Sequence, residues 1–307
     1  MSLFFFSDES DNNIAQKKEK MMRQLFVVVA CLSRVGVRAF SVVPQQQQSR
    51  RACRLFAWGA EPTWSPVEVL SNKQCGDDLY EMFVEVSESQ AKAFEKPGQF
   101  VQLKSGDNKP GFFAIASPPT SEKSEKSIFE FLVKKTDSND WLVGAKEGSA
   151  LDMSEVIGKG YDLSQWQGDM GEVNQNYDGF ACMNYLFLAQ GTGIAPIRAT
   201  IEAGAALELP KPATLYYGAR DSKHAAYHAK YDAWLKDYNV KVVEIHSKPE
   251  SDWTGKTGYV QDVLKADGIE VPRNAGAIVC GNKDFFTENK ELLLKAGVFE
   301  GRILTNI

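Results

Sequence analysis

A short glycine-rich segment stands between an apolar run and a helical stretch in the second half of the chain. The apolar run ends at Ala189, and the segment reads Gly191, Thr192, Gly193, Ile194, Ala195 and Pro196. Two glycines let a backbone turn tightly and approach a ligand, while a proline suits a first helical turn, where a missing N–H costs nothing. The free N–H groups and the dipole of such a helix face an anion. The spacing predicts a pyrophosphate-binding turn, and the alternative is a strand-to-helix turn without a ligand.

Two further groups of polar side chains follow later apolar strands. Cys280 and Gly281 come after Ala277–Val279, where a cysteine is either a site residue or a small buried side chain. Ser247 and Lys248 come after Val240–Ile245, and Tyr259 stands further along. A hydroxyl, a cation and an aromatic face suit a phosphorylated adenosine, although a solvated loop carries the same residue types.

The elements that must position these residues alternate between strand and helix. Strands are expected at 185–188, 213–218, 240–245, 277–279 and 303–304, with helices from 197, over 225–238, around 259–266 and over 285–296. Such alternation predicts a doubly wound parallel sheet, whose ligands bind outside the carboxyl ends of the strands.

The preceding part of the chain has the pattern of short antiparallel strands. Leu79–Val86 places Met82, Val84 and Val86 on one face, and Phe129, Phe131 and Val133 alternate with their neighbours. Turn formers separate these runs, which predicts a small barrel or sandwich. We expect an extension and presequence over 1–57, a barrel domain over 58–178 and a dinucleotide-binding domain over 179–307.

Taken together, these motifs resemble the ferredoxin-NADP reductase superfamily, and the variant Phe-x-Ala-Ile-Ala-Ser-Pro-Pro is similar to its plastid, fruit-protein-like branch. The resemblance covers 58–307 and implies an antiparallel FAD-binding β-barrel followed by a doubly wound NAD(P)-binding domain. It implies that Cys280 and Gly281 lie beside the nicotinamide, where hydride passes to flavin, so Cys280 is the candidate catalytic residue. It also implies that Ser247, Lys248 and Tyr259 bind the adenosine end. NADPH is favoured over NADH, although Lys248 replaces the usual arginine and lacks its bidentate fork.

On the flavin side, Gly111 to Pro118 resembles the strand that holds FAD in this superfamily. Phe113 takes the place of the tyrosine that stacks on the isoalloxazine, Ala114 replaces the serine that meets flavin N5, and Gly111 stands where an arginine contacts the FAD pyrophosphate. The remaining flavin-side candidates are Ile115, Ser117, Gly158 and Gly160. A valine at Gly193, on the other domain, is expected to block the dinucleotide and leave the barrel folded.

Composition excludes several classes of function. From Glu61 onwards the chain has 36 acidic and 26 basic side chains, a formal charge of about −10, so nucleic acid is not expected as a partner. The same charge disfavours an acidic ferredoxin as acceptor. Cys75, Cys182 and Cys280 are too scattered for a disulfide framework or a metal site, and no bound metal is expected.

The first sixty residues have the composition of a targeting sequence. No acid occurs between Glu19 and Glu61, whereas six arginines do. The apolar run at 25–32 is shorter than a membrane span and fits a signal peptide; the Ser/Gln/Arg-rich stretch after Ala39 reads as a transit peptide. This arrangement resembles the bipartite plastid presequence of diatoms, with translation starting at Met21 or Met22, and the alternative is a tail with a chance apolar run.

The leading hypothesis is therefore a plastid flavoenzyme that passes hydride from NAD(P)H to FAD and on to an acceptor that the sequence does not identify. The alternative is a non-catalytic plastid subunit that kept the fold and lost flavin chemistry, motivated by Gly111 and Ala114.

The presequence composition generates the first prediction. A fluorescent protein fused behind Met21–Trp64 should accumulate in the plastid, because this segment carries the signal and transit features. Microscopy of transformed algal cells checks this, and a cytosolic signal would contradict the plastid assignment.

Overall fold

The computed structural model describes residues 61–119, 127–166 and 180–306. Phe56–Ile307 form one compact unit by their contacts. The expectations for the extension and presequence over 1–57 lie outside the described residues.

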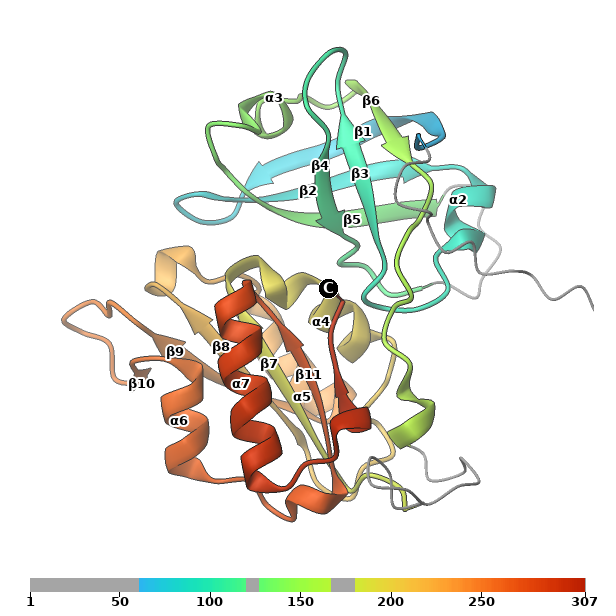
Figure 1. The fold of residues 1–307 in the computed structure, drawn as a ribbon. Coiled ribbons are helices and arrows are strands. Elements are labelled where there is room, and N and C mark those ends of the chain that lie inside the picture. The colour runs from blue at the N-terminus through green and yellow to red at the C-terminus, as the bar shows by residue number, and fades with distance from the viewer. Residues whose placement is uncertain (1–60, 120–126, 167–179, 307) are drawn as a thin grey trace, which may run out of the picture. The chain divides into compact units, whose positions relative to one another are not determined.

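The first sheet is a nearly closed antiparallel barrel of six strands (Figure 1). Its spatial order is β4-β3-β6-β1-β2-β5. The elements in chain order are β1 Trp64–Gln74, β2 Leu79–Val86, α2 Glu88–Ala93, β3 Phe100–Lys104, β4 Gly111–Ala114, β5 Ser127–Lys134, α3 Asp140–Val143 and β6 Ala150–Ser154. The predicted alternation is confirmed, since Met82, Val84, Phe129 and Phe131 are buried in the barrel core.

Closure of the barrel depends on the residues that follow β4. The Ala116 N–H donates to the Glu130 carbonyl over 2.7 Å, and the Glu130 N–H donates to the Ser117 hydroxyl over 3.2 Å. These two bonds join the end of β4 to β5, the two edge strands of the sheet, so fewer backbone groups remain unpaired.

The second sheet is parallel, with strand order β10-β9-β8-β7-β11-β12. Helices α4 and α5 pack on one face over one apolar core, and α6 and α7 pack on the other over a second (Figure 1). The main elements are β7 Asn184–Gln190, α4 Ile194–Glu202, β8 Ala213–Ala219, α5 Tyr231–Tyr238, β9 Val240–His246, β10 Lys256–Thr257, α6 Val260–Asp267, β11 Ala275–Cys280, α7 Lys283–Ala296 and β12 Ile303–Leu304. This is the predicted doubly wound sheet.

Two helix boundaries differ from the sequence-based expectation. The helix expected over 225–238 begins only at Tyr231. Tyr227 has a left-handed conformation with φ 67°, so a right-handed helix cannot run through it. The helix expected from Ile197 begins at Ile194, so Pro196 lies in its first turn, where its missing N–H has no intrahelical partner to lose. No helix in the described ranges is long and apolar enough to cross a membrane.

A buried ion pair joins helix α4, which follows the glycine-rich turn, to strand β5 of the barrel. The Arg198 side chain on α4 is 5% exposed, lies 2.6 Å from the Glu130 carboxylate on β5 and donates to both oxygens of Glu202. Burial alone would raise the pKa of Glu202, but Arg198 and the indole of Trp234 outweigh it and lower that pKa. The arginine therefore holds the Glu202 carboxylate in its charged form and also pairs with Glu130 where α4 meets the barrel.

This cluster generates a stability prediction. Arg198→Leu leaves the two carboxylates without their buried partner, and breaking such a pair costs about 3–5 kcal/mol of unfolding free energy at pH 7. Because the pKa of Glu202 is lowered in the folded state, its contribution is present above the ordinary value of 4.5 and is lost as the pH falls below it. The cost of Arg198→Leu should therefore shrink below that pH.

Urea unfolding of both proteins over this pH range checks the prediction. Lys92→Leu is the control, because it removes an exposed ion pair with Glu88 within α2 and should unfold like the wild type. A loss for Arg198→Leu no larger than that control would contradict the assigned role of the cluster.

Candidate functional site

One cleft of about 1280 Å³ lies at the carboxyl ends of the parallel strands. The chain leaves the middle of the sheet after β7, builds β8 and β9 on one side and returns to add β11 on the other, so β7 and β11 are parallel neighbours. Their last residues, Gln190 and Cys280, both line the cleft. This is the switch point of an open α/β sheet, where ligands bind.

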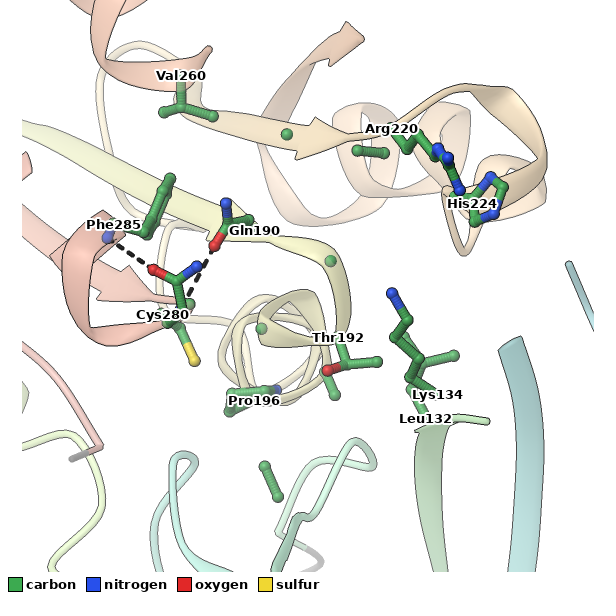
Figure 2. Close-up of a pocket in the computed structure, with 18 of the residues that line it drawn as sticks. Leu132, Lys134, Gln190, Thr192, Pro196, Arg220, His224, Val260, Cys280 and Phe285 are labelled. Carbon is green, nitrogen blue, oxygen red and sulfur yellow. Dashed lines mark hydrogen bonds between the residues drawn. The ribbon is translucent and has the colours of Figure 1, made fainter. Parts of the chain in front are cut away.

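The turn after β7 is a single 3₁₀ turn, Gly191–Gly193, that runs directly into α4. Gly191 has φ +54°, a backbone conformation that favours glycine. A Cβ added there would meet no atom within 4 Å, so the position faces open space. The N–H groups of this first turn have no intrahelical partners and suit an anion. Thr192 and Pro196 line the cleft beside them (Figure 2).

Gly193 is glycine for a different reason from the one expected. Its φ is −60°, an ordinary helical value, and a Cβ there would overlap the carbonyl of Cys280, whose carbon would lie 2.7 Å away. The glycine thus allows the turn to pack on the end of β11. The expectation that Gly193→Val acts only on the dinucleotide is wrong in its physical basis, because any side chain at this position must first displace the β11 backbone.

Cys280 is a buried neutral thiol. It is 6% exposed, and burial raises its pKa to about 12, so it is not a thiolate nucleophile at neutral pH. The thiol donates to the Asn306 amide oxygen over 3.3 Å. Asn306 also lines the cleft, so Cys280 and Asn306 present a small polar surface beside the glycine-rich turn.

The ends of β8 and β9 form the far part of the cleft. The Ser247 N–H donates to the Ala219 carbonyl over 3.0 Å, and the Lys248 N–H donates to the Arg220 carbonyl over 2.7 Å. These bonds hold the two strand ends together, and both Ser247 and Arg220, which Figure 2 labels, line the cleft. Tyr259 lines it as well, with its ring 58% exposed and free to stack on a planar group.

The barrel supplies another part of the lining, which is mostly apolar and includes three phenylalanines. These are Phe100, Phe112 and Phe113. Phe112 is 65% exposed, and its ring meets the Phe100 ring edge-on with the two centroids 5.9 Å apart. The ring of Phe113 lies over Gly111, whose added Cβ would be 2.8 Å from it. Gly111, where the superfamily resemblance implies a cation, thus has an aromatic ring packed beside it.

The structure brings most of the predicted site residues to the cleft and leaves others outside its lining. The lining includes Phe113, Ala114, Gly191, Thr192, Gly193, Ala195, Pro196, Ser247, Tyr259, Cys280 and Gly281. The predicted residues outside the lining are Ile115, Ser117, Gly158, Gly160, Ile194 and Lys248.

Four residues of the second group pack or form hydrogen bonds within the barrel domain. Ile115 is in the barrel core and Ser117 closes the barrel. Gly158 has φ +89° and packs under the Phe100 ring, and Gly160 has φ +66° and packs on Lys96. Positive φ and close packing favour glycine at both positions, and their assignment to the flavin stays a prediction.

Several residues that line the cleft belong to no motif that the sequence analysis selected. Arg220 and His224 follow β8, and the expected strand at 213–218 already placed that segment at the carboxyl edge. Phe112 was a variable position between two motif residues, and only the burial pattern of β4 shows that it is exposed. Asn282 caps α7 through the Phe285 N–H over 2.8 Å and joins β7 through Gln190 (Figure 2). No group of three or more His, Cys, Asp or Glu side chains that could hold a metal occurs in the described parts of the chain.

Comparison with known proteins defines the class. Residues 187–290 match the oxidoreductase NAD-binding domain family. The fold is shared with the ferredoxin reductase of carbazole 1,9a-dioxygenase, with a TM-score of 0.63 at 19% identity over 81% of this chain and 70% of that one. It is also shared with a ferredoxin NADP⁺ reductase from Neisseria gonorrhoeae solved with bound FAD and NADP, with a TM-score of 0.62 at 14% identity over 80% and 98% of the two chains. The protein therefore has the fold of ferredoxin-NADP reductase-like proteins and contains an oxidoreductase NAD-binding domain over 187–290.

The chain is 30% identical over 253 residues to fruit protein pKIWI502 of Actinidia deliciosa. The matched segment covers 78% of this chain and 76% of that protein. It therefore belongs to the family of that fruit protein. It is also 27% identical to an NAD(P)H-flavin reductase of Aliivibrio fischeri over 56% of this chain and 69% of that protein.

The geometry of the turn generates a matched pair of variants. Gly191→Asp and Gly191→Asn both place a side chain in open space, and both residues tolerate a left-handed conformation. The carboxylate should repel a phosphate where the amide does not, so we expect Gly191→Asp to bind NADP⁺ at least tenfold more weakly than Gly191→Asn, a difference of about 1.4 kcal/mol.

Calorimetry on both proteins checks this difference, with thermal unfolding to show that both are folded. Equal affinities in two folded variants would contradict the assignment of this turn to the dinucleotide phosphates.

Proposed function

We propose that the protein is a flavin-dependent NAD(P)H oxidoreductase that passes hydride from NAD(P)H to a flavin, FAD being the form that its family implies. The observation that carries the proposal is the composition of one cleft, whose lining includes a glycine-rich turn at a helix N-terminus, Cys280 and three phenylalanines of the barrel. We place the flavin on the barrel, within 58–178, and the dinucleotide on 179–307.

The chain's own residues bind and orient in this scheme. The N–H groups of the 191–193 turn receive the dinucleotide phosphates. Tyr259 stacks on the adenine, and the Cys280–Asn306 pair borders the nicotinamide ring. A bound flavin supplies the hydride-accepting chemistry, and the protein supplies position and electrostatics.

Cys280 acts in this proposal as a neutral group of fixed position. Its thiol proton is engaged by Asn306, and its raised pKa keeps it protonated, so it can line the ring without adding charge to the path of the hydride. Because Gly193 packs on its carbonyl, the thiol and the phosphate-binding turn have one fixed separation.

The adenosine end supports a preference for NADPH. The cations at this end include Arg220, whose guanidinium can pair with a phosphate through two parallel hydrogen bonds, as Lys248 cannot. Arg220, Ser247 and His224 all line this part of the cleft. We further propose a plastid location and a plastid acceptor, on the composition of the first sixty residues.

The direct test is NADPH oxidation by the purified protein with added FAD and an artificial acceptor. We expect turnover, together with loss of the oxidised flavin absorbance when NADPH is added without oxygen. Gly191→Asp should bind flavin normally and fail to bleach it, since its defect is on the dinucleotide. Wild-type protein that binds NADPH and stays inactive with FAD would instead support the non-catalytic alternative.

The adenosine end gives a separate prediction. Arg220→Gln should weaken NADPH binding by about tenfold or more and leave NADH within about twofold, because only NADPH carries the 2′-phosphate. Lys223→Gln is the matched control, since it removes a nearby cation that does not line the cleft. Equal losses for NADPH and NADH in Arg220→Gln would contradict the assignment.

A further inference from the structure

The cleft contains an ion pair that the proposed function does not use. Asp78 and Lys134 both line the cleft, and the Lys134 ammonium lies 3.2 Å from the Asp78 carboxylate. Asp78 stands directly before β2, and Lys134 is the last residue of β5, so the barrel supplies both. Among the described residues, Lys134 and Arg220 are the lysine and arginine side chains of the lining. Lys134 is therefore the cation that the barrel contributes to the cleft.

The barrel fold keeps this pair together. Leu79, the residue after Asp78, is the register partner of Lys134 in the β2–β5 ladder. The Lys135 N–H also donates to the Asp78 carbonyl over 2.7 Å, which joins the backbone of Asp78 to the end of β5. The carboxylate and the ammonium are thus held as neighbours by the backbone hydrogen bonds of the barrel.

The two partners differ in how freely their side chains can move. The Asp78 side chain is 28% exposed, and its Oδ1 atom is buried without a hydrogen-bond partner among the described residues. The Lys134 side chain is 57% exposed and has a long, flexible stem. If the ammonium turns to another anion, a partly buried carboxylate is left without its cation, which costs free energy.

The Lys134 ammonium and the turn assigned to the dinucleotide phosphates belong to one cleft. Figure 2 shows the Lys134 side chain extending into this cleft on the side of Thr192. A phosphate on the N–H groups of the 191–193 turn would attract the ammonium, because opposite charges interact beyond direct contact. The phosphate and the Asp78 carboxylate then compete for one cation.

Resting on the proposed function, we propose that Asp78 limits the affinity of the cleft for the dinucleotide, because its carboxylate competes with the dinucleotide phosphates for the Lys134 ammonium. NADPH and NADP⁺ carry the same phosphates, so the competition weakens the binding of both. It therefore favours release of the oxidised product, a step that limits the rate of many enzymes.

Calorimetric titration of the full chain with NADP⁺ tests this inference without requiring a flavin. Asp78→Asn keeps the size of the side chain and removes its charge, so it should tighten NADP⁺ binding by about threefold. Lys134→Gln should weaken binding by about the same factor. In a protein with both substitutions the gain from Asp78→Asn should be lost, because there is no ammonium left to release.

The neighbouring ion pair of Lys135 and Asp140 provides the matched controls. Its atoms lie 3.3 Å apart at the same end of β5, and neither residue lines the cleft. Asp140→Asn and Lys135→Gln should therefore change the NADP⁺ affinity by less than about 1.5-fold. Asp78→Ser, which also removes the charge, replaces Asp78→Asn if thermal unfolding shows that Asp78→Asn is not folded.

Two results would overturn this inference and leave the proposed function standing. One is a folded Asp78→Asn protein that binds NADP⁺ no more tightly than Asp140→Asn, and the other is a gain that persists when Lys134 is also replaced. Absence of NADP⁺ binding by both the wild type and a folded Asp78→Asn protein would overturn the proposed function as well.

Discussion

The close packing of Gly193 on the carbonyl of Cys280 is the constraint on which the site depends. Because β7 and β11 are parallel neighbours, their carboxyl ends emerge together, and the absence of a side chain at Gly193 lets the turn after β7 settle on the end of β11. This contact places the first N–H groups of α4 beside the buried thiol. The glycine-rich turn and the polar surface formed by Cys280 and Asn306 then belong to one edge of the sheet.

The rest of the molecule divides the chemistry between two walls. The parallel sheet carries the polar and cationic groups at its strand ends, whereas the barrel presents aromatic rings. Arg198 joins these halves by pairing with Glu130 of β5 and Glu202 of α4 at the base of the helix that carries the turn. The same helix therefore carries the glycine-rich turn at its start and contacts the barrel through Arg198. The distance between the two walls thus depends on this buried ion pair.

Much of this arrangement could be predicted from the sequence. The strand and helix periods predicted both sheets, and the order of strand, glycine-rich turn and helix located Gly191 to Pro196 at the carboxyl edge. Local patterns carry this information because they reflect which face of an element is buried. The start of α5 was missed because Tyr227 adopts a left-handed conformation that no local pattern announces. The reason for Gly193, the exposure of Phe112 and the approach of Arg220 to Ser247 depend on contacts between distant segments, so no motif could reveal them.

The central claim is that a dinucleotide on the parallel sheet and a flavin on the barrel meet closely enough for direct hydride transfer. The most direct measurement is rapid mixing of the FAD-loaded protein, without oxygen, with NADPH carrying either hydrogen or deuterium at the transferred position of nicotinamide C4. The account predicts that flavin absorbance is lost in a single turnover and that the loss is clearly slower with deuterium. Loss at the same rate with both isotopes, or no loss of flavin absorbance by a protein that binds both ligands, would contradict it.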